Sequence, residues 1–293
     1  MENVGPRPRL GLPTKAGKRK YLVVMGCLVE RYKKELEKEI PEVDLFISVK
    51  EYDKFWDKIE ELITDREGSP FNKGAANEVD WGFFNYQNRV ITTGKTTAYL
   101  KIAEGCSNRC TYCAIPYIRG PYISRKMEDI LEEARKLAAD GIKEVIIIAQ
   151  DTTKYGIDIY GKPMLAQLLE EMCRIEGFEW IRFLYAYPES ITDELIETVR
   201  KNGKICNYFD IPIQHISNRI LKTMGRPVGA GFHARPNEYI ENLIQKIRRE
   251  IPDVIIRTSL IVGFPGEDEK DFQMLYDFVE KTRFDKLRSI HVF

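Results

Sequence analysis

Apolar and polar positions along this chain form blocks that predict strands and helices in alternation. In the N-terminal part the pattern predicts strands over residues 21–25 and 43–49, and charged helices over 30–39 and 52–63. This order describes a small βαβα unit, which we place at residues 21–66. Residues 1–20 are basic and rich in Pro and Gly, so we expect a tag or a disordered arm there.

A longer alternation follows a segment without a hydrophobic period. Residues 67–88 contain Gly and Pro and predict a linker, and a second domain is expected over 89–293. Its predicted strands are 96–103, 144–149, 180–185, 208–213, 254–262 and one near Ile290. Its predicted helices are 127–139, 165–175, 192–201, a short one from Asn218, 239–250 and 269–281.

Six strands separated by helices predict a parallel α/β sheet, because parallel neighbours need crossover connections. The strand at 144–149 is almost entirely apolar, which is typical of burial on both faces. Six units are fewer than the eight of a closed barrel, so we expect an open or partial (β/α)6 barrel. Its chemistry should lie at the carboxyl ends of the strands.

Composition restricts the function classes. The chain has 293 residues, with 45 Lys and Arg against 45 Asp and Glu, so no net charge favours binding to DNA or RNA. No apolar run approaches the roughly 18 residues of a membrane-spanning helix, and no membrane partner or secretory signal is predicted. Six cysteines are too few for a disulfide scaffold, and clustered thiols suit a reducing cytoplasm.

Three of the six cysteines, Cys106, Cys110 and Cys113, form a C-x3-C-x2-C pattern directly after the first strand of the second domain. Three buried thiols, or a structural zinc site completed by a histidine, are alternatives, although no histidine lies near this loop in the sequence. Iron–sulfur ligation explains the pattern more directly. A four-iron cluster takes four thiolates, so three would leave one iron open for S-adenosylmethionine.

The cysteine segment resembles the radical-SAM signature, including the aromatic Tyr112 before the last cysteine. The segments 98–106, 113–116, 149–156, 209–215 and 261–267 further resemble the methylthiotransferase family. They are most similar to its branch that methylthiolates the β-carbon of an aspartate in the twelfth small-subunit ribosomal protein.

The resemblance implies a partial (β/α)6 radical-SAM barrel preceded by a partial small α/β N-terminal domain. It implies two [4Fe-4S] clusters, with S-adenosylmethionine bound at the one held by Cys106, Cys110 and Cys113. The implied partners are the ribosomal protein substrate and an electron donor such as flavodoxin or ferredoxin. Neither DNA nor a membrane is an expected partner, and the expected location is the cytoplasm.

Several polar residues are candidates for the cofactor pocket, and none is assigned as catalytic. Asp151 follows an apolar strand, where a pocket residue and a helix N-cap are equally good interpretations from the sequence alone. The resemblance assigns to the pocket Tyr112, Gln150, Asp151, Arg182, Gln214 and Arg257. For His215 we favour a hydrogen-bonded structural role, and for residues 263–267 a tight strand-to-helix turn.

Cys27 stands at the end of the first predicted strand. A lone thiol is most often a packed core residue, but the resemblance makes Cys27 a ligand of a second, auxiliary [4Fe-4S] cluster. The family pattern has two more such ligands upstream, and residues 1–20 contain no cysteine. It also continues into a small C-terminal β-domain, so we expect a fragment that is incomplete for full turnover. Cys173 and Cys206 are expected in the core, and the loop 225–236 has no counterpart that we can assign.

Two other functions stay open at this point. The tRNA-modifying branch of the family acts on an adenosine, but its typical Gly-Gln-Asn-Val-Asn pattern differs from the Ala-Gln-Asp-Thr-Thr at 149–153. A non-catalytic zinc-binding module is the alternative from a different class.

Overall fold

The computed structural model describes residues 21–67, 91, 93–226 and 236–292. The chain divides into two compact units: one contains residues 1–89 with Tyr117–Arg119, and the other contains Val90–Pro116 and Gly120–Phe293. The expected arm at 1–20, most of the expected linker and most of the loop at 225–236 lie outside the described residues. None of the described helices is both long and apolar enough to cross a membrane.

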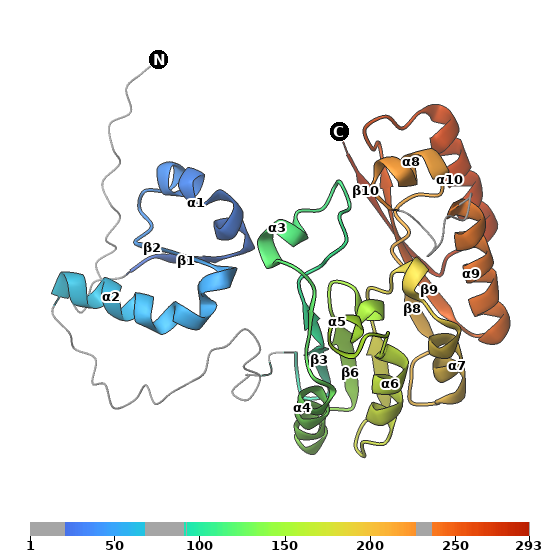
Figure 1. Cartoon of the computed structure of the whole chain (residues 1–293), viewed down its shortest axis with the longest axis horizontal. Coiled ribbons are helices and arrows are strands. Elements are labelled where there is room, and N and C mark those ends of the chain that lie inside the picture. Colours follow the sequence, from blue (N-terminus) through green and yellow to red (C-terminus); the bar gives the residue numbers. More distant parts are fainter. Residues whose placement is uncertain (1–20, 68–90, 92, 227–235, 293) are drawn as a thin grey trace. The chain divides into compact units, whose positions relative to one another are not determined.

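The first unit is built on two parallel strands (Figure 1). Its elements are β1 (Val23–Gly26), α1 (Cys27–Glu39), β2 (Leu45–Ser48), the 3-10 helix η1 (Val49–Lys54) and α2 (Phe55–Glu67). Ile47 of β2 and Val29 of α1 are buried, which places the apolar contact between sheet and helix. The capping box of Ser48 and Glu51 fixes the start of η1, and the hydrogen bond from the Ser48 backbone lowers the pKa of Glu51 to about 2.

Parallel strands form the second unit, in two three-stranded groups ordered β3-β6-β7 and β10-β9-β8. They are β3 (Thr97–Lys101), β6 (Glu144–Ile148), β7 (Trp180–Phe183), β8 (Tyr208–Asp210), β9 (Ile255–Val262) and β10 (Lys286–His291). A parallel bridge between Ile181 and Ile205 continues the arrangement from β7 towards β8. No closed barrel forms among the described strands, and the predicted partial barrel is confirmed.

Helices connect these strands on one side of the sheets (Figure 1). They are α4 (Met127–Ala139), α6 (Leu165–Cys173), α7 (Asp193–Lys201), α8 (Asn218–Thr223), α9 (Pro236–Glu250) and α10 (Glu269–Thr282). Side-chain caps fix two of the starts: Thr192 accepts from the Leu195 amide before α7, and Asp268 accepts from the Asp271 amide before α10.

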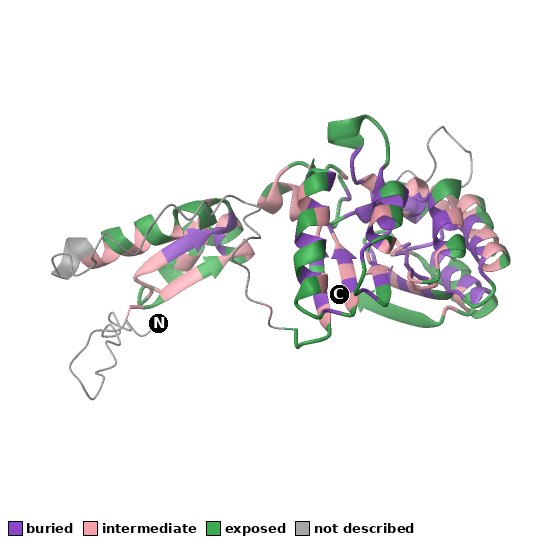
Figure 2. Cartoon of the chain, turned by 90° about the horizontal axis from the view of Figure 1, so that it is seen from below, coloured by how far each residue is buried: buried purple, intermediate pink, exposed green. Residues whose placement is uncertain are grey.

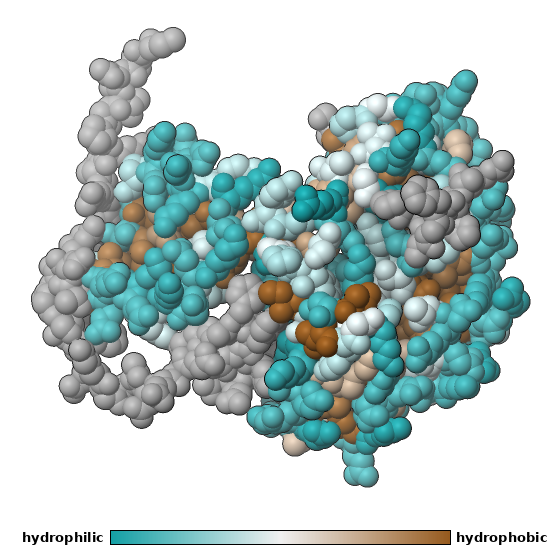
Figure 3. All heavy atoms as spheres, in the orientation of Figure 1, coloured by the Kyte–Doolittle hydropathy of each residue, from teal (hydrophilic) through white to brown (hydrophobic). Residues whose placement is uncertain are grey.

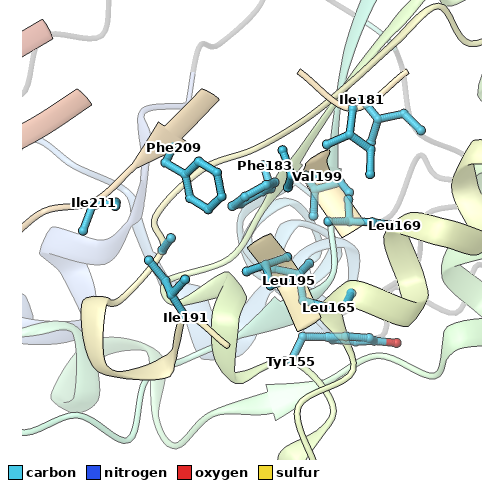
Figure 4. Packing of buried hydrophobic residues seen from close by; sticks show 14 of the residues in the cluster. Tyr155, Leu165, Leu169, Ile181, Phe183, Ile191, Leu195, Val199, Phe209 and Ile211 are labelled. Carbon is cyan, nitrogen blue, oxygen red and sulfur yellow. The ribbon is translucent and has the colours of Figure 1, made fainter. Parts of the chain in front are cut away.

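The core lies between the sheets and these helices. Alternate strand residues such as Leu100, Ile147 and Phe183 are fully buried against the helices, and Figure 2 shows this burial along the strands. Phe183 and Phe209 pack edge to face with ring centroids 5.3 Å apart (Figure 4). In Figure 3 most of the visible surface is hydrophilic, and a small group of apolar residues gathers over α5 (Ile157–Tyr160).

The sequence pattern missed the short elements around the cysteines. The predicted strand 96–103 is wrong in extent: it is β3 followed by β4 (Ala103–Glu104), which pairs antiparallel with β5 (Ile123–Ser124). Between β4 and β5 lies α3 (Ile115–Arg119), and the 3-10 helices η2 (Thr152–Lys154) and η3 (Pro188–Ser190) follow β6 and β7. These elements are too short to show a hydrophobic period.

Candidate functional site

The cysteine loop, residues 105–114, leaves β4 and ends at α3, closed at its base by the β4–β5 pair. The Cys106 amide donates to the Gly120 carbonyl at 3.1 Å, so the start of the loop is held to the residue that follows α3. Gly105 makes this approach possible, because its φ is +71° and a Cβ there would lie 2.0 Å from the Pro121 carbonyl oxygen. The position before the first cysteine therefore requires glycine.

Three free thiols lie on this loop: Cys110 is buried, and Cys106 and Cys113 are half-buried. A backbone hydrogen bond from Cys113 to Cys110 at 3.0 Å makes a turn between the last two. Burial raises the pKa of Cys106, and the neighbouring Asp151, Cys113 and Cys110 raise it further. These neighbours disfavour the Cys106 thiolate, and binding to cationic iron would stabilise it.

Among the described residues, no group of three His, Cys, Asp or Glu side chains is placed to hold a metal ion. The loop fits an iron–sulfur cluster because of the ligands that it offers. It carries three free thiols directly after β4, and no disulfide joins them.

Asp151 connects the carboxyl end of β6 to the cysteine loop. It is fully buried and caps η2, accepting from the Thr153 amide at 3.2 Å and from the Thr153 hydroxyl at 2.5 Å. Its second oxygen accepts from Asn108 of the loop at 3.2 Å, and its carbonyl accepts from the Tyr122 hydroxyl at 2.7 Å. Burial raises the pKa of Asp151. The N-cap interpretation is thereby confirmed, and the same carboxyl group also positions the loop.

Two tyrosine hydroxyls face Cys110. The Tyr187 hydroxyl lies 3.1 Å from the Cys110 sulfur, and the Tyr112 hydroxyl faces the same thiol. Tyr112 also accepts a 3.2 Å hydrogen bond from Arg226, whose guanidinium lies 4.0 Å from the centroid of the Tyr187 ring. Burial raises the pKa of both tyrosines, so both hydroxyls are protonated at neutral pH.

Four other predicted pocket residues lie at the carboxyl edge or along the sheet face opposite the helices: Gln150 after β6, Arg182 in β7, Gln214 after β8 and Arg257 in β9. Gln150 is exposed. Gln214 has a φ of +68°, and Tyr185 beyond β7 has a φ of +61°. A positive φ in a residue other than glycine is strained, and residues strained in this way are most often found at active sites and ligand-binding sites.

Both strand arginines have carboxylate partners. Arg182 donates to Glu144 at 2.8 Å, and its guanidinium lies 4.8 Å from the Tyr208 ring centroid. Arg257 lies 3.6 Å from Asp210. A contact of either arginine with a cofactor remains a prediction.

His215 is fully buried, and its Nδ1 accepts from the Ser217 amide at 2.9 Å. Its Nε2 lies 3.4 Å from Glu267, whose other oxygen accepts from the amides of Gly263 and Phe264 at 2.7 and 2.9 Å. Burial lowers the pKa of His215. These contacts support the structural interpretation of His215, and residues 263–267 form the tight turn that was predicted between β9 and α10.

The remaining cysteines lie apart from the loop. Cys27 begins α1 in the first unit, where its sulfur accepts from Arg119 of the same unit at 3.2 Å. Cys173 packs against the core as expected. Cys206 is half-buried beside Arg182 rather than within the core cluster.

Sequence reasoning missed the residues that hold the cysteine loop in place: Asn108, Tyr122, Thr153, Tyr187 and Arg226. Asn108 could have been noticed, since an amide inside the motif faces the same strand edge as Asp151. Tyr122 lies nine residues after Cys113 but belongs to no recognisable motif, whereas Thr153, Tyr187 and Arg226 lie far from the cysteines in sequence and meet them only through the fold.

A partial parallel barrel with three cysteines in the loop after its first strand is typical of radical-SAM enzymes, and the comparison with known proteins supports this class. Residues 100–279 match the family model described as the Radical SAM superfamily. This match covers more than half of the chain, and the chain belongs to the radical SAM superfamily.

The curated relatives indicate a particular branch of this superfamily. The chain is 64% identical over 273 residues to the ribosomal protein uS12 methylthiotransferase RimO of Alkaliphilus oremlandii, and this covers 93% of the chain and 58% of that protein. It is 53% identical over 268 residues to RimO of Acetivibrio thermocellus, covering 91% of the chain and 58% of that protein. The chain therefore spans less than two thirds of the length of these relatives.

Solved structures agree on the fold. TsrM from Kitasatospora setae, a radical S-adenosylmethionine methyltransferase, superposes with a TM-score of 0.53 over 67% of this chain and 36% of that chain, at 17% identity. That structure contains cobalamin and a [4Fe-4S] cluster. At this identity the likeness supports the fold alone.

Proposed function

We propose that this chain carries the radical-SAM chemistry of a methylthiotransferase that adds a methylthio group to the β-carbon of an aspartate in ribosomal protein uS12. The observation that carries the proposal is the cysteine loop, held at the carboxyl edge of the barrel by Gly105 and Asp151. The 64% identity to a RimO protein supports the choice of substrate.

In this proposal Cys106, Cys110 and Cys113 each bind one iron of a [4Fe-4S] cluster. The cluster and S-adenosylmethionine supply the one-electron cleavage that starts the reaction. The chain orients these groups: Asn108 and Asp151 hold the loop, and the Tyr187 hydroxyl, 3.1 Å from the Cys110 sulfur, would donate a hydrogen bond to it once that sulfur binds iron. Tyr112, Gln150, Gln214 and the strand arginines line the space where S-adenosylmethionine would bind.

The proposal extends to the auxiliary chemistry and the partners. Cys27, whose sulfur lies 3.2 Å from the Arg119 guanidinium, is one ligand of a second [4Fe-4S] cluster. A flavodoxin or ferredoxin supplies the electron. The protein acts in the cytoplasm on a ribosomal protein, without a DNA or membrane partner.

Deleting the gene tests the substrate. Mass spectrometry should then find uS12 without its methylthio group, while methylthio-adenosine in tRNA is unchanged. Loss of the tRNA modification with uS12 still modified would overturn the proposal and assign the protein to the tRNA-modifying branch. Complementation by the intact gene, and failure of complementation by a gene carrying Cys106→Ala, controls for effects on neighbouring genes.

A further inference from the structure

Arg226 is a buried charge whose role the sequence does not explain. Its side chain is 2% exposed, and Nη1 donates to the Tyr112 hydroxyl at 3.2 Å. Among the described residues, its Nε and Nη2 have no hydrogen-bond partner. Burying a guanidinium with incomplete hydrogen bonding is costly, so a purely structural role is a poor account of an arginine here.

The fold attaches this arginine directly to the cysteine loop. The Thr111 amide donates to the Met224 carbonyl at 3.0 Å, and the Thr111 hydroxyl donates to the Thr223 carbonyl at 3.1 Å. Gly225 has a φ of +66°, and a Cβ there would lie 2.9 Å from the Arg109 carbonyl oxygen. The residues at the end of α8 therefore pack against residues 109–111 of the cysteine loop, and this contact places Arg226 next to the loop.

From this position Arg226 reaches Cys110 through two tyrosines. Its guanidinium stacks on the Tyr187 ring at 4.0 Å, and the Tyr187 hydroxyl lies 3.1 Å from the Cys110 sulfur. Its hydrogen bond to the Tyr112 oxygen leaves the hydroxyl proton of Tyr112 free to face the same sulfur. Two neutral hydroxyl donors and one cation thus converge on a single predicted cluster ligand.

One acidic group opposes this charge. Glu189 faces Arg226, and the Glu189 Oε2 atom has no hydrogen-bond partner among the described residues. Burial raises the pKa of Glu189 to about 7, so its carboxylate only partly neutralises the arginine at neutral pH.

We propose that Arg226 is a positioning residue that raises the reduction potential of the cluster held by Cys106, Cys110 and Cys113, acting through Tyr187 and Tyr112. This inference rests on the proposed function. Reduction adds one electron, taken from a one-electron reductant, and breaks no bond, so the cluster becomes more negative. A nearby buried cation and hydrogen bonds to a ligating sulfur stabilise the reduced state more than the oxidised state.

The test is a potentiometric titration of the anaerobically reconstituted protein, with the reduced cluster followed by electron paramagnetic resonance. R226Q removes the charge, and we expect it to lower the ratio of reduced to oxidised cluster at a fixed potential by about tenfold, or ~59 mV for one electron. R226K keeps the charge but loses the planar stacking, so its change should be smaller. Y187F removes one hydroxyl and should also lower the ratio. R174Q, which changes an arginine on the surface, is the matched control and should match the wild type.

An R226Q protein with full iron content and an unchanged potential would overturn the inference. If R226Q fails to fold or to hold iron, Y187F decides by the same criterion: a lowered ratio supports the inference, and an unchanged ratio overturns it. Failure of the proposed function looks different, because the wild-type protein itself would then retain no iron and sulfide.

Discussion

Replacing Gly105 by alanine tests whether the geometry before the first cysteine holds the loop. The added Cβ would lie 2.0 Å from the Pro121 carbonyl oxygen and 2.7 Å from the Gly120 carbonyl oxygen, so the backbone must move. That movement breaks the 3.1 Å hydrogen bond from the Cys106 amide to Gly120, worth about 1 kcal/mol. The left-handed φ of +71° adds roughly 1–2 kcal/mol for alanine, giving a loss of about 2–3 kcal/mol in the free energy of unfolding.

Gly161→Ala is the matched control. Gly161 lies outside the cysteine loop with a φ of +74° and a ψ of 3°, in the left-handed region, and nothing lies within 4 Å of the position that a Cβ would take there. Only the left-handed cost of roughly 1–2 kcal/mol therefore applies. Urea denaturation of both variants measures the difference, and iron retention after reconstitution measures the effect on the loop. Equal stability and equal iron content in the two variants would refute the reasoning.

Three further outcomes follow from the buried groups. The pKa of Glu189 is about 7 in the folded protein, against an ordinary value of 4.5, so the folded state keeps this proton to a higher pH than the unfolded state does. The free energy of unfolding should therefore fall by up to about 3 kcal/mol as the pH rises from 4.5 to 7. Urea denaturation over this pH range should show a smaller change for E189Q than for the wild type. Phe183→Ala should cost about 3–5 kcal/mol by calorimetry, because it leaves a cavity beside Phe209, and a loss below ~1 kcal/mol would contradict the packing. Asp151→Asn places an amide donor against either Asn108 or Thr153, which should cost about 1–3 kcal/mol and reduce iron retention, whereas unchanged iron content would count against its role in the loop.

The sequence predicted the repeating part of the fold because long segments carry a clear period. The apolar strand at β6 and the amphipathic α9 were located within a few residues of their bounds. The short pieces around the cysteines were not predicted. Elements such as β4, β5 and η2 have two or three residues each, and tertiary contacts rather than local periodicity determine them.

The candidate site divides in the same way. The three cysteines could be found because their spacing within one loop is itself the signal. Arg226 and Tyr187 could not be found in this way, because both lie far along the chain from Cys110. Arg226 comes close only because the end of α8 packs against the cysteine loop. For Asp151 the sequence left two roles equally probable, and the structure shows that capping η2 and holding Asn108 use different oxygens of one carboxyl group.

The most direct test of the central claim is the iron and sulfide content of the anaerobically reconstituted protein, measured together with 5′-deoxyadenosine formation from S-adenosylmethionine. The wild-type protein should bind iron and sulfide in equal amounts and form 5′-deoxyadenosine under reducing conditions. Cys106→Ala should abolish that product, while Cys173→Ala, outside the loop, should retain it. Zinc in place of iron, or undiminished cleavage by Cys106→Ala, would contradict the assignment of this loop to a radical-SAM cluster.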